Sequence, residues 1–363
     1  MPEIHAARRA GALVALAGLD ADAVLVTAGP NVRYLTGLAS SNAALLLPAD
    51  GTALLATDSR YELAARRDAP DLDLTVGRFI EPLLAAAAGR RGLRRLAVET
   101  HDLTVDRYGQ FAAAAEDVGL VSFGQKIEEL RAIKDPSELE LLGTACRITD
   151  QAFADVLPQI RPGLSERALA AALDHRMAEL GAERPAFDTI VASGPNGALP
   201  HHEPSGRPLR RGDLITMDFG ALFAGYHADM TRTVALGEPA DWQREVYELV
   251  AAAQRAGCTA ARPGAALREV DAAARDLISE AGHGEHFRHG LGHGVGLEAH
   301  EAPMIGYGST GKLEDCVSVT VEPGVYLPGQ GGVRIEDVLI VGAGRADGAA
   351  QILTRTTKEL LAL

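Results

Sequence analysis

Residues 214–219 read Leu-Ile-Thr-Met-Asp-Phe, and residues 228–233 read Ala-Asp-Met-Thr-Arg-Thr. Side chains alternate along a strand, so Asp218 falls on the face opposite its apolar neighbours. Glycines between residues 220 and 225 predict a turn that brings the second stretch back beside the first. We therefore expect Asp218 and Asp229 to point into one cavity from paired strands.

Two strand-like stretches further along the chain repeat this pattern. Residues 317–322 place three valines on one face and Glu322 on the other. Residues 333–336 place Arg334 and Glu336 opposite an apolar pair. Four carboxylates on apolar strands need compensation, by protonation, by pairing with arginine or by bound cations. Together with one imidazole, they are a ligand set for two ions of Mn²⁺, Co²⁺ or Zn²⁺.

Eight of the eleven histidines lie between residues 201 and 300. His293, within Gly-Leu-Gly-His-Gly, is either an ordinary loop residue or a candidate nitrogen ligand. The chain has no His-Glu-x-x-His, no Gly-x-Ser-x-Gly and no P-loop, which excludes a zincin, a serine-hydrolase elbow and a P-loop nucleotide site. The tract His-x-x-His-x-x-His at residues 283–289 could chelate metal, but we interpret it as a polar surface approach to the site.

Periodicity predicts two domains. Helical and strand-like stretches alternate over the first ~130 residues and predict an α/β domain with a hairpin turning at Asp50-Gly51. Asp-Pro-Ser-Glu at residues 135–138 predicts a helix start with a capping box. We place the boundary near residue 128, which gives domains 1–128 and 129–363. In the second domain, Arg-Pro-Gly precedes a predicted helix twice, at 161–163 and 262–264, which predicts an α+β domain of two related halves.

The amino-acid composition argues against two classes of partner and indicates a cellular location. The chain has 363 residues, of which 47% are apolar, and 49 acidic residues against 35 Lys and Arg give a net charge of −14. Because this excess of negative charge repels phosphate backbones, we expect no nucleic-acid partner. No stretch approaches the ~20 apolar residues of a membrane span, so we expect no membrane partner. Cys146, Cys258 and Cys316 are few and widely spaced, which is typical of the reducing cytoplasm.

Several short stretches resemble motifs of the pita-bread metallopeptidases. They are Met-Asp-Phe-Gly at 217–220, Ala-Asp-Met-Thr-Arg-Thr at 228–233, Gly-His-Gly-Val-Gly at 292–296, Val-Glu-Pro-Gly at 321–324 and Arg-Ile-Glu-Asp at 334–337. Asn-Val-Arg-Tyr-Leu-Thr-Gly at 31–37 resembles a creatinase/prolidase-type first domain, which points to the proline-specific branch. The resemblance implies an α/β creatinase/prolidase-like N-terminal domain followed by an α+β pita-bread catalytic domain with an internal pseudo-two-fold.

The resemblance also implies a role for each position. The metal ligands would be Asp218, Asp229, His293, Glu322 and Glu336. In that pattern Asp218 and Glu322 each bind one ion, while Asp229 and Glu336 bridge both. The substrate-binding residues would be His201, His289, His300 and Arg334. Glu322 would accept a proton from the attacking water, His300 would donate to the developing oxyanion, and His201 would assist beside the proline.

These roles predict an Xaa-Pro aminopeptidase that acts on proline-containing peptides with two divalent ions, for which we expect Mn²⁺ ahead of Co²⁺ or Zn²⁺. The resemblance implies a homodimer or a higher homo-oligomer. The alternative is an Xaa-Pro dipeptidase, which must pair the free carboxylate of proline with a cation. Met304 stands where we expect that cation, so we favour longer peptides. A creatinase-like amidinohydrolase or an inactive binding protein would be expected to lack the metal ligands.

Overall fold

The computed structural model describes residues 2–115, 117–345 and 347–363, which form two compact units, Met1–Arg131 and Ala132–Leu363. The division predicted from sequence, at residues 128/129, stays a prediction and would fall inside helix α6. The elements of the first unit are α1 (Pro2–Leu16), β1 (Ala23–Val26), α2 (Gly29–Thr36), β2 (Ala43–Pro48), β3 (Leu54–Thr57), α3 (Glu62–Asp68), β4 (Asp73–Val76), α4 (Ile80–Arg90), β5 (Arg95–Val98), α5 (Val105–Ala114), β6 (Gly119–Ser122) and α6 (Lys126–Ala132).

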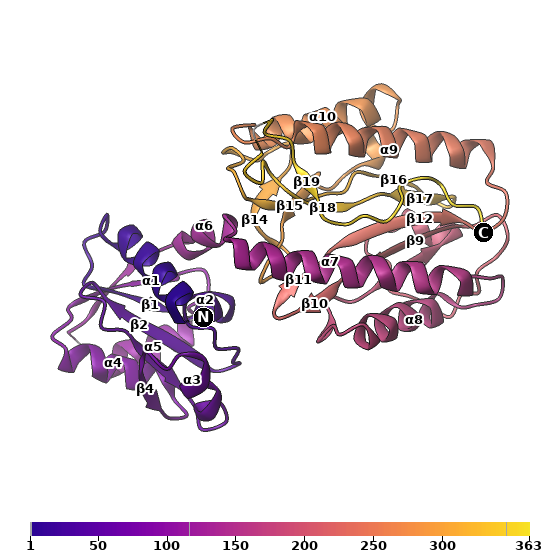
Figure 1. Cartoon of the computed structure of the whole chain (residues 1–363). Coiled ribbons are helices and arrows are strands. Elements are labelled where there is room, and N and C mark those ends of the chain that lie inside the picture. Colours follow the sequence, from indigo (N-terminus) through magenta and orange to yellow (C-terminus); the bar gives the residue numbers. More distant parts are fainter. Residues whose placement is uncertain (1, 116, 346) are drawn as a thin grey trace. The chain divides into compact units, whose positions relative to one another are not determined.

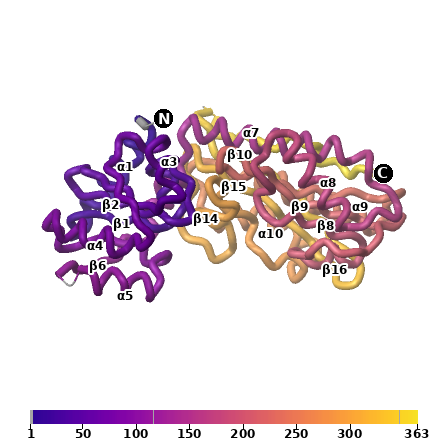
Figure 2. Tube along the Cα trace, turned by 90° about the horizontal axis from the view of Figure 1, so that it is seen from below, coloured from indigo at the N-terminus to yellow at the C-terminus, as the bar shows by residue number. Residues whose placement is uncertain are grey.

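A mixed six-stranded sheet, in the order β4-β3-β2-β1-β5-β6, forms the centre of the first unit. The predicted hairpin is present: β2 and β3 pair antiparallel around Gly51, whose φ of +83° suits glycine. Figure 2 shows α1 and α3 on one face of the sheet and α4 and α5 on the other. Apolar residues of α4 and α5 pack with one face of the strands in a buried cluster, which fixes a three-layer α/β unit.

The Asn31 side chain explains the motif at residues 31–37. It is fully buried, its Nδ2 donates to Glu99 Oε1 at 2.5 Å, and its Oδ1 accepts from Arg131 Nη1 at 2.7 Å. Glu99 is also buried and accepts from the backbone amides of Thr27 and Ala28. The motif therefore joins β1, α2 and α6 through satisfied buried hydrogen bonds.

The second unit is α+β. Its elements are α7 (Pro136–Val156), η1 (Leu157–Gln159), α8 (Glu166–Glu179), β7 (Arg184–Pro185), β8 (Ile190–Ser193), η2 (Gly194–Ala198), β9 (Leu214–Phe219), β10 (Ala221–Phe223), β11 (Tyr226–His227), β12 (Met230–Ala235), α9 (Asp241–Ala260), α10 (Leu267–Glu280), η3 (Gly284–His286), β13 (Gly292–Gly294), β14 (Glu301–Ile305), β15 (Ser318–Val321), β16 (Gly324–Leu327), β17 (Gly331–Arg334), β18 (Asp337–Ile340) and β19 (Gln351–Ile352). Helix α7 starts at the predicted capping box, where Asp135 caps and Glu138 bonds back to the Asp135 amide. Among the described residues, no helix is both long and apolar enough to cross a membrane.

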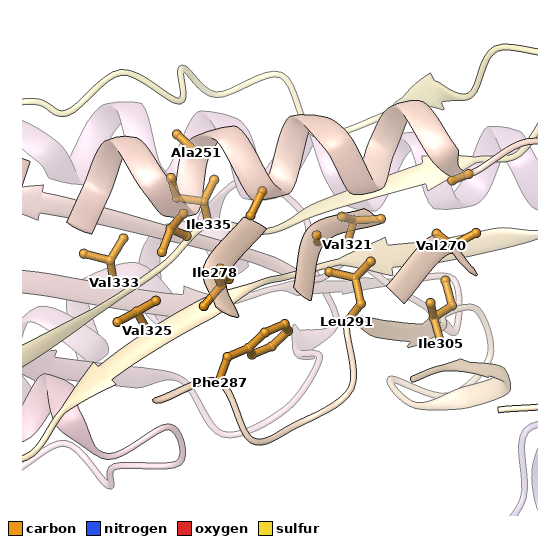
Figure 3. Close-up of a cluster of buried hydrophobic side chains, with 14 of the residues drawn as sticks. Ala251, Val270, Ile278, Phe287, Leu291, Ile305, Val321, Val325, Val333 and Ile335 are labelled. Carbon is orange, nitrogen blue, oxygen red and sulfur yellow. The ribbon is translucent and has the colours of Figure 1, made fainter. Parts of the chain in front are cut away.

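Two helix pairs enclose the strands of this unit (Figure 1). Helices α7 and α8 pack with β8, β9 and β12 in one apolar core. Helices α9 and α10 pack with β15, β16 and β17 in a second core, where Ile278 lies among Val325, Leu291 and Phe287 (Figure 3). The strands form a five-stranded sheet β14-β13-β15-β18-β19, two three-stranded sheets, β12-β9-β8 and β11-β10-β7, and a two-stranded sheet β16-β17. Strand ends from several sheets therefore lie between the helix pairs.

The two Arg-Pro-Gly turns have equivalent backbone partners. The Gly163 amide donates to the Leu209 carbonyl at 2.9 Å, and the Gly264 amide donates to the Leu313 carbonyl at 2.7 Å. Each turn is followed by a helix, α8 in the first half and α10 in the second. This matched order supports the prediction of two related halves.

A buried ionic network ties the C-terminal segment to the strands. The Arg232 guanidinium is 2% exposed, contacts Asp337 Oδ1 at 2.7 Å and donates to the Thr356 and Thr357 carbonyls. Asp337 also contacts Lys358 Nζ at 2.9 Å. Beyond this network, the Leu363 amide donates to the Ala235 carbonyl of β12 at 2.9 Å. The segment is thus part of the framework of the second unit.

Candidate active site

A cavity of about 470 Å³ opens in the second unit and collects every predicted site residue. Its walls include Asp218, Asp229, His293, Glu322, Glu336, His201, His289, His300 and Arg334. Ligand atoms of Asp229, His293 and Glu336 lie within 4.8 Å of one another. The predicted residues are thus brought together from three strands and six loops, while their individual roles stay predictions.

The positions of the acids within the strands differ from the prediction. Only Asp218 lies inside a strand, β9; Asp229 precedes β12, Glu322 follows β15, and Glu336 lies between β17 and β18. Pro323, which cannot donate to a strand ladder, follows Glu322 at the point where the chain leaves β15. Strand ends can turn their carboxylates toward a common point, whereas acids in the middle of strands of separate sheets would stay apart.

His293 is oriented by its backbone neighbours. Its Nδ1 donates to the Gly294 carbonyl at 3.0 Å, which leaves Nε2 facing Glu322 Oε1 at 3.2 Å and Asp229 Oδ2 at 3.7 Å. The flanking glycines are required by packing, because a Cβ would meet the Thr320 carbonyl oxygen at 2.1 Å from Gly292 and the Ala302 oxygen at 2.2 Å from Gly294. An imidazole whose Nδ1 is bonded to a carbonyl presents Nε2 as a metal ligand.

Burial and mutual repulsion dominate the electrostatics of the acids. Burial raises the pKa of Asp229 and of Glu336 well above the usual range, and the neighbouring carboxylates raise both further. Burial also opposes ionisation of Glu322, but the hydrogen bond and charge of His293 lower its pKa to about 2. The same contact outweighs burial at His293 and raises the pKa of its imidazole. Divalent cations would neutralise this excess of negative charge.

Asp218 offers the clearest fit to a metal ion. Its Oδ2 accepts from Arg334 Nη2 at 2.7 Å. Its Oδ1 is buried and has no hydrogen-bond partner among the described residues. A buried carboxylate oxygen without a donor is costly, and a cation in the cavity would satisfy it. The residues present therefore fit a carboxylate-rich centre for divalent metal.

Arg334 lies in a chain of hydrogen bonds that connects the carboxylates of the cavity with Tyr326 and His289. Its Nε donates to Thr231 Oγ1 at 3.0 Å, and that hydroxyl donates to Glu336 Oε2 at 2.7 Å. Its Nη1 donates to the Tyr326 hydroxyl at 2.9 Å, and the same hydroxyl lies 2.9 Å from His289 Nε2. Because His289 Nδ1 lies 2.8 Å from the Gly290 carbonyl and must donate to it, Tyr326 donates to His289.

Tyr326 was missed by the sequence analysis. It lies in a short strand of apolar character, and no sequence signal links it to His289, 37 residues away. Burial raises the pKa of Tyr326 to about 12, so the hydroxyl keeps its proton. Its position between Arg334 and His289 follows only from the fold.

His201, His300 and Met304 lie toward the solvent side of the cavity, and all three are exposed. The His300 ring packs on the His293 ring, with centroids 4.2 Å apart. In the tract at residues 283–289, His283 and His286 pair with each other, with their Nδ1 atoms 3.2 Å apart, while His289 turns into the cavity.

These features define a class of protein: an α/β unit joined to an α+β unit whose cavity carries a carboxylate and imidazole centre for divalent metal. Comparison with known families agrees. The chain belongs to metallopeptidase family M24, whose model matches residues 140–343, and the creatinase/prolidase N-terminal domain matches residues 8–133. The predicted fold, a creatinase-type first domain and a pita-bread catalytic domain, is confirmed, and the chain is a metallopeptidase.

Individual relatives extend over nearly the whole chain. An Xaa-Pro dipeptidase from Pyrococcus horikoshii is 36% identical over 344 residues, which cover 94% of both proteins. The structure of an Xaa-Pro dipeptidase from Bacillus anthracis is 38% identical, with a TM-score of 0.93 and full coverage of both chains. The structure of an X-Pro aminopeptidase from Thermotoga maritima is 34% identical, with a TM-score of 0.88 and coverage of 96% of this chain and 100% of that chain.

Proposed function

We propose that this protein hydrolyses the Xaa-Pro bond at the N-terminus of peptides, with two divalent ions bound in the cavity. The observation that carries the proposal is the convergence of four carboxylates and one imidazole, with a buried oxygen of Asp218 that has no partner among the described residues. The names of the relatives, Xaa-Pro dipeptidase and X-Pro aminopeptidase, support proline-specific cleavage.

We assign the metal ligands as Asp218, Asp229, His293, Glu322 and Glu336. These five side chains would hold the two ions between them. We propose Mn²⁺ because carboxylate-rich sites suit it, with Co²⁺ and Zn²⁺ as alternatives. Metal analysis of protein purified without added metal tests the identity of the ions.

The bound ions would supply an activated water and polarise the scissile carbonyl. The chain's own residues do the rest. Glu322, on the cavity wall, would accept a proton from the attacking water. His300 donates a hydrogen bond to the developing oxyanion. His201 and His289 enclose the proline ring, and Arg334 holds Asp218 and Tyr326 in place.

The lining of the cavity favours peptides longer than two residues. A dipeptidase must pair the free carboxylate of proline with a cation. Apart from histidines, Arg334 is the one cationic side chain among the described residues of the lining, and it already bonds Asp218, Tyr326 and Thr231. Met304, 53% exposed, can pack against a continuing peptide but cannot pair with a carboxylate.

The second candidate is an Xaa-Pro dipeptidase, which the names of the Pyrococcus and Bacillus proteins favour. Comparing kcat/KM for an Xaa-Pro dipeptide with that for an Xaa-Pro-Xaa tripeptide separates the two. We expect the tripeptide to be preferred. A clear preference for the dipeptide would reject the aminopeptidase and show that a cation outside this lining serves the carboxylate.

We also propose that hydrolysis depends on metal, that the chain forms a homo-oligomer and that it is located in the cytoplasm. Treatment with a chelator should abolish hydrolysis, and added Mn²⁺ should restore it, whereas full activity in chelator would contradict a metal-dependent site. Sedimentation of the full chain tests the proposed homodimer or higher oligomer. The cytoplasm is the proposed location, in keeping with three free cysteines among the described residues.

A further inference from the structure

His201 reaches the cavity from a loop rather than from a strand or helix. The loop runs from η2 to Ser205, and among the described residues the His201 ring has no hydrogen-bond partner. An exposed side chain of this kind takes its position from the backbone that carries it. What fixes residues 194–205 therefore fixes His201.

One buried carboxylate, that of Glu166, holds both ends of this loop. Its Oε1 accepts from the amide and hydroxyl of Ser193, at 2.8 and 2.7 Å, and from Asn196 Nδ2 at 2.9 Å. Its Oε2 lies 2.9 Å from His202 Nε2 and accepts from the amide and hydroxyl of Ser205, at 3.1 and 2.6 Å. Glu166 is 0% exposed, so these contacts replace its water entirely.

The carboxylate is ionised in this setting. Burial alone would raise the pKa of Glu166, but hydrogen bonds from Ser205, Ser193 and His202 lower it to about 2. Hydrogen bonds to a charged group are about twice as strong as those between neutral groups. Each contact of the ionised Glu166 carboxylate therefore holds the loop more firmly than a neutral side chain would.

The second half of the catalytic unit shows that the backbone does not require an acid here. The Glu166 amide donates to the Arg207 carbonyl at 3.1 Å, and the Leu267 amide, at the equivalent start of α10, donates to the Gly311 carbonyl at 3.2 Å. Leu267 packs in an apolar core, yet its helix begins in the same way. The side chain of Glu166 is thus an addition to the first half, where the loop that it binds carries His201.

We propose that Glu166 is a positioning residue, which holds the loop at residues 194–205 so that His201 faces the proline of the substrate. The inference rests on the proposed function only in the role given to His201. Glu166 lies outside the cavity lining, so its effect passes through the loop and not through the metal ligands.

A double-mutant cycle tests this. The variants are Glu166→Gln, His201→Ala and both together, assayed for kcat/KM on an Xaa-Pro-Xaa peptide with Mn²⁺ bound. A misplacement of about 1 Å can cost on the order of 10²-fold, so we expect Glu166→Gln to approach the loss of His201→Ala. We expect the double variant to lose no more than His201→Ala alone. Losses that multiply would overturn the proposal, because Glu166 would then act independently of His201.

Hydrogen exchange on the same full-length variants gives a readout that needs no activity. Glu166→Gln should speed exchange in residues 194–205 and leave residues 309–313, at the equivalent junction, unchanged. Glu179→Gln, which removes an exposed acid from the same helix, should change neither. Wild-type exchange in the loop of Glu166→Gln would overturn the proposal even if the protein proved unable to cleave Xaa-Pro bonds, and that inability alone would count only against the proposed function.

Discussion

Replacing Asp337 with asparagine removes one charge from the buried network beside Glu336. Asp337 is 0% exposed and contacts Arg232, Lys358, Gln254 and Thr354 at 2.7 to 2.9 Å. Lys358 is 29% exposed and can turn to water, but Arg232 is 2% exposed and cannot. The asparagine variant therefore leaves a buried guanidinium without its counter-ion.

Breaking a buried pair by removing one partner costs ~3–5 kcal/mol. A domain of the size of the second unit loses roughly 2–4 °C of Tm per kcal/mol. We therefore expect Asp337→Asn to lower the Tm of that unit by roughly 6–20 °C. The first unit, which does not contain these residues, should keep its transition.

Differential scanning calorimetry of the full chain at neutral pH measures both transitions. The control is Glu238→Gln, which breaks the exposed pair with Arg244 and should cost no more than ~1 kcal/mol. If Asp337→Asn lowered the Tm no further than Glu238→Gln does, the assignment of a stabilising role to the buried charge would be wrong.

Three further predictions concern the site. His293→Ala should lose metal, whereas His300→Ala should keep both ions and raise the activation barrier by ~3–4 kcal/mol; metal analysis with kinetics checks this, and the reverse pattern would exchange the two roles. Tyr326→Phe removes a hydroxyl that serves Arg334 and His289, so denaturant unfolding should show a loss of ~1–3 kcal/mol, and an unchanged stability would contradict the buried contacts. Because the folded pKa of Glu166 lies near 2, below its ordinary 4.5, its stabilisation is complete above pH 4.5 and is lost as the pH falls toward 2; the stability gap between wild type and Glu166→Gln should therefore close over that range, and a constant gap would refute it.

Local signals predicted much of the fold. The capping box at Asp135 and the turn at Asp50-Gly51 fix neighbouring backbone, so a short stretch of sequence was enough to predict α7 and the β2–β3 hairpin. Helix α2 was not predicted, because it has only eight residues, which include weak helix formers. The fold stabilises it instead through the contacts of Asn31 with Glu99 and Arg131.

The candidate site, like the fold, could be predicted from the sequence only in part. Acids on apolar strands are conspicuous in a sequence, so Asp218, Asp229, Glu322 and Glu336 could be identified as residues of one site. Their convergence from strand ends depends on how the sheets meet, which alternation within a strand does not encode. Glu166 was missed because an acid directly after the helix cap Ser165 is ordinary, and its partners lie 27 to 39 residues further on.

The pairing of Leu363 with Ala235 sets an order of events during biosynthesis. About 130 residues separate these two partners, which takes a ribosome roughly 6–26 s at ~5–20 residues per second. At the start of that interval β9 and β12 have been made, but Arg334, Glu336 and the segment that encloses Arg232 follow only about 100 residues later. The nascent chain therefore carries Asp218 and Asp229 without the rest of the centre. The second unit therefore completes its candidate metal site late in this stretch of synthesis, after the first unit has had time to fold.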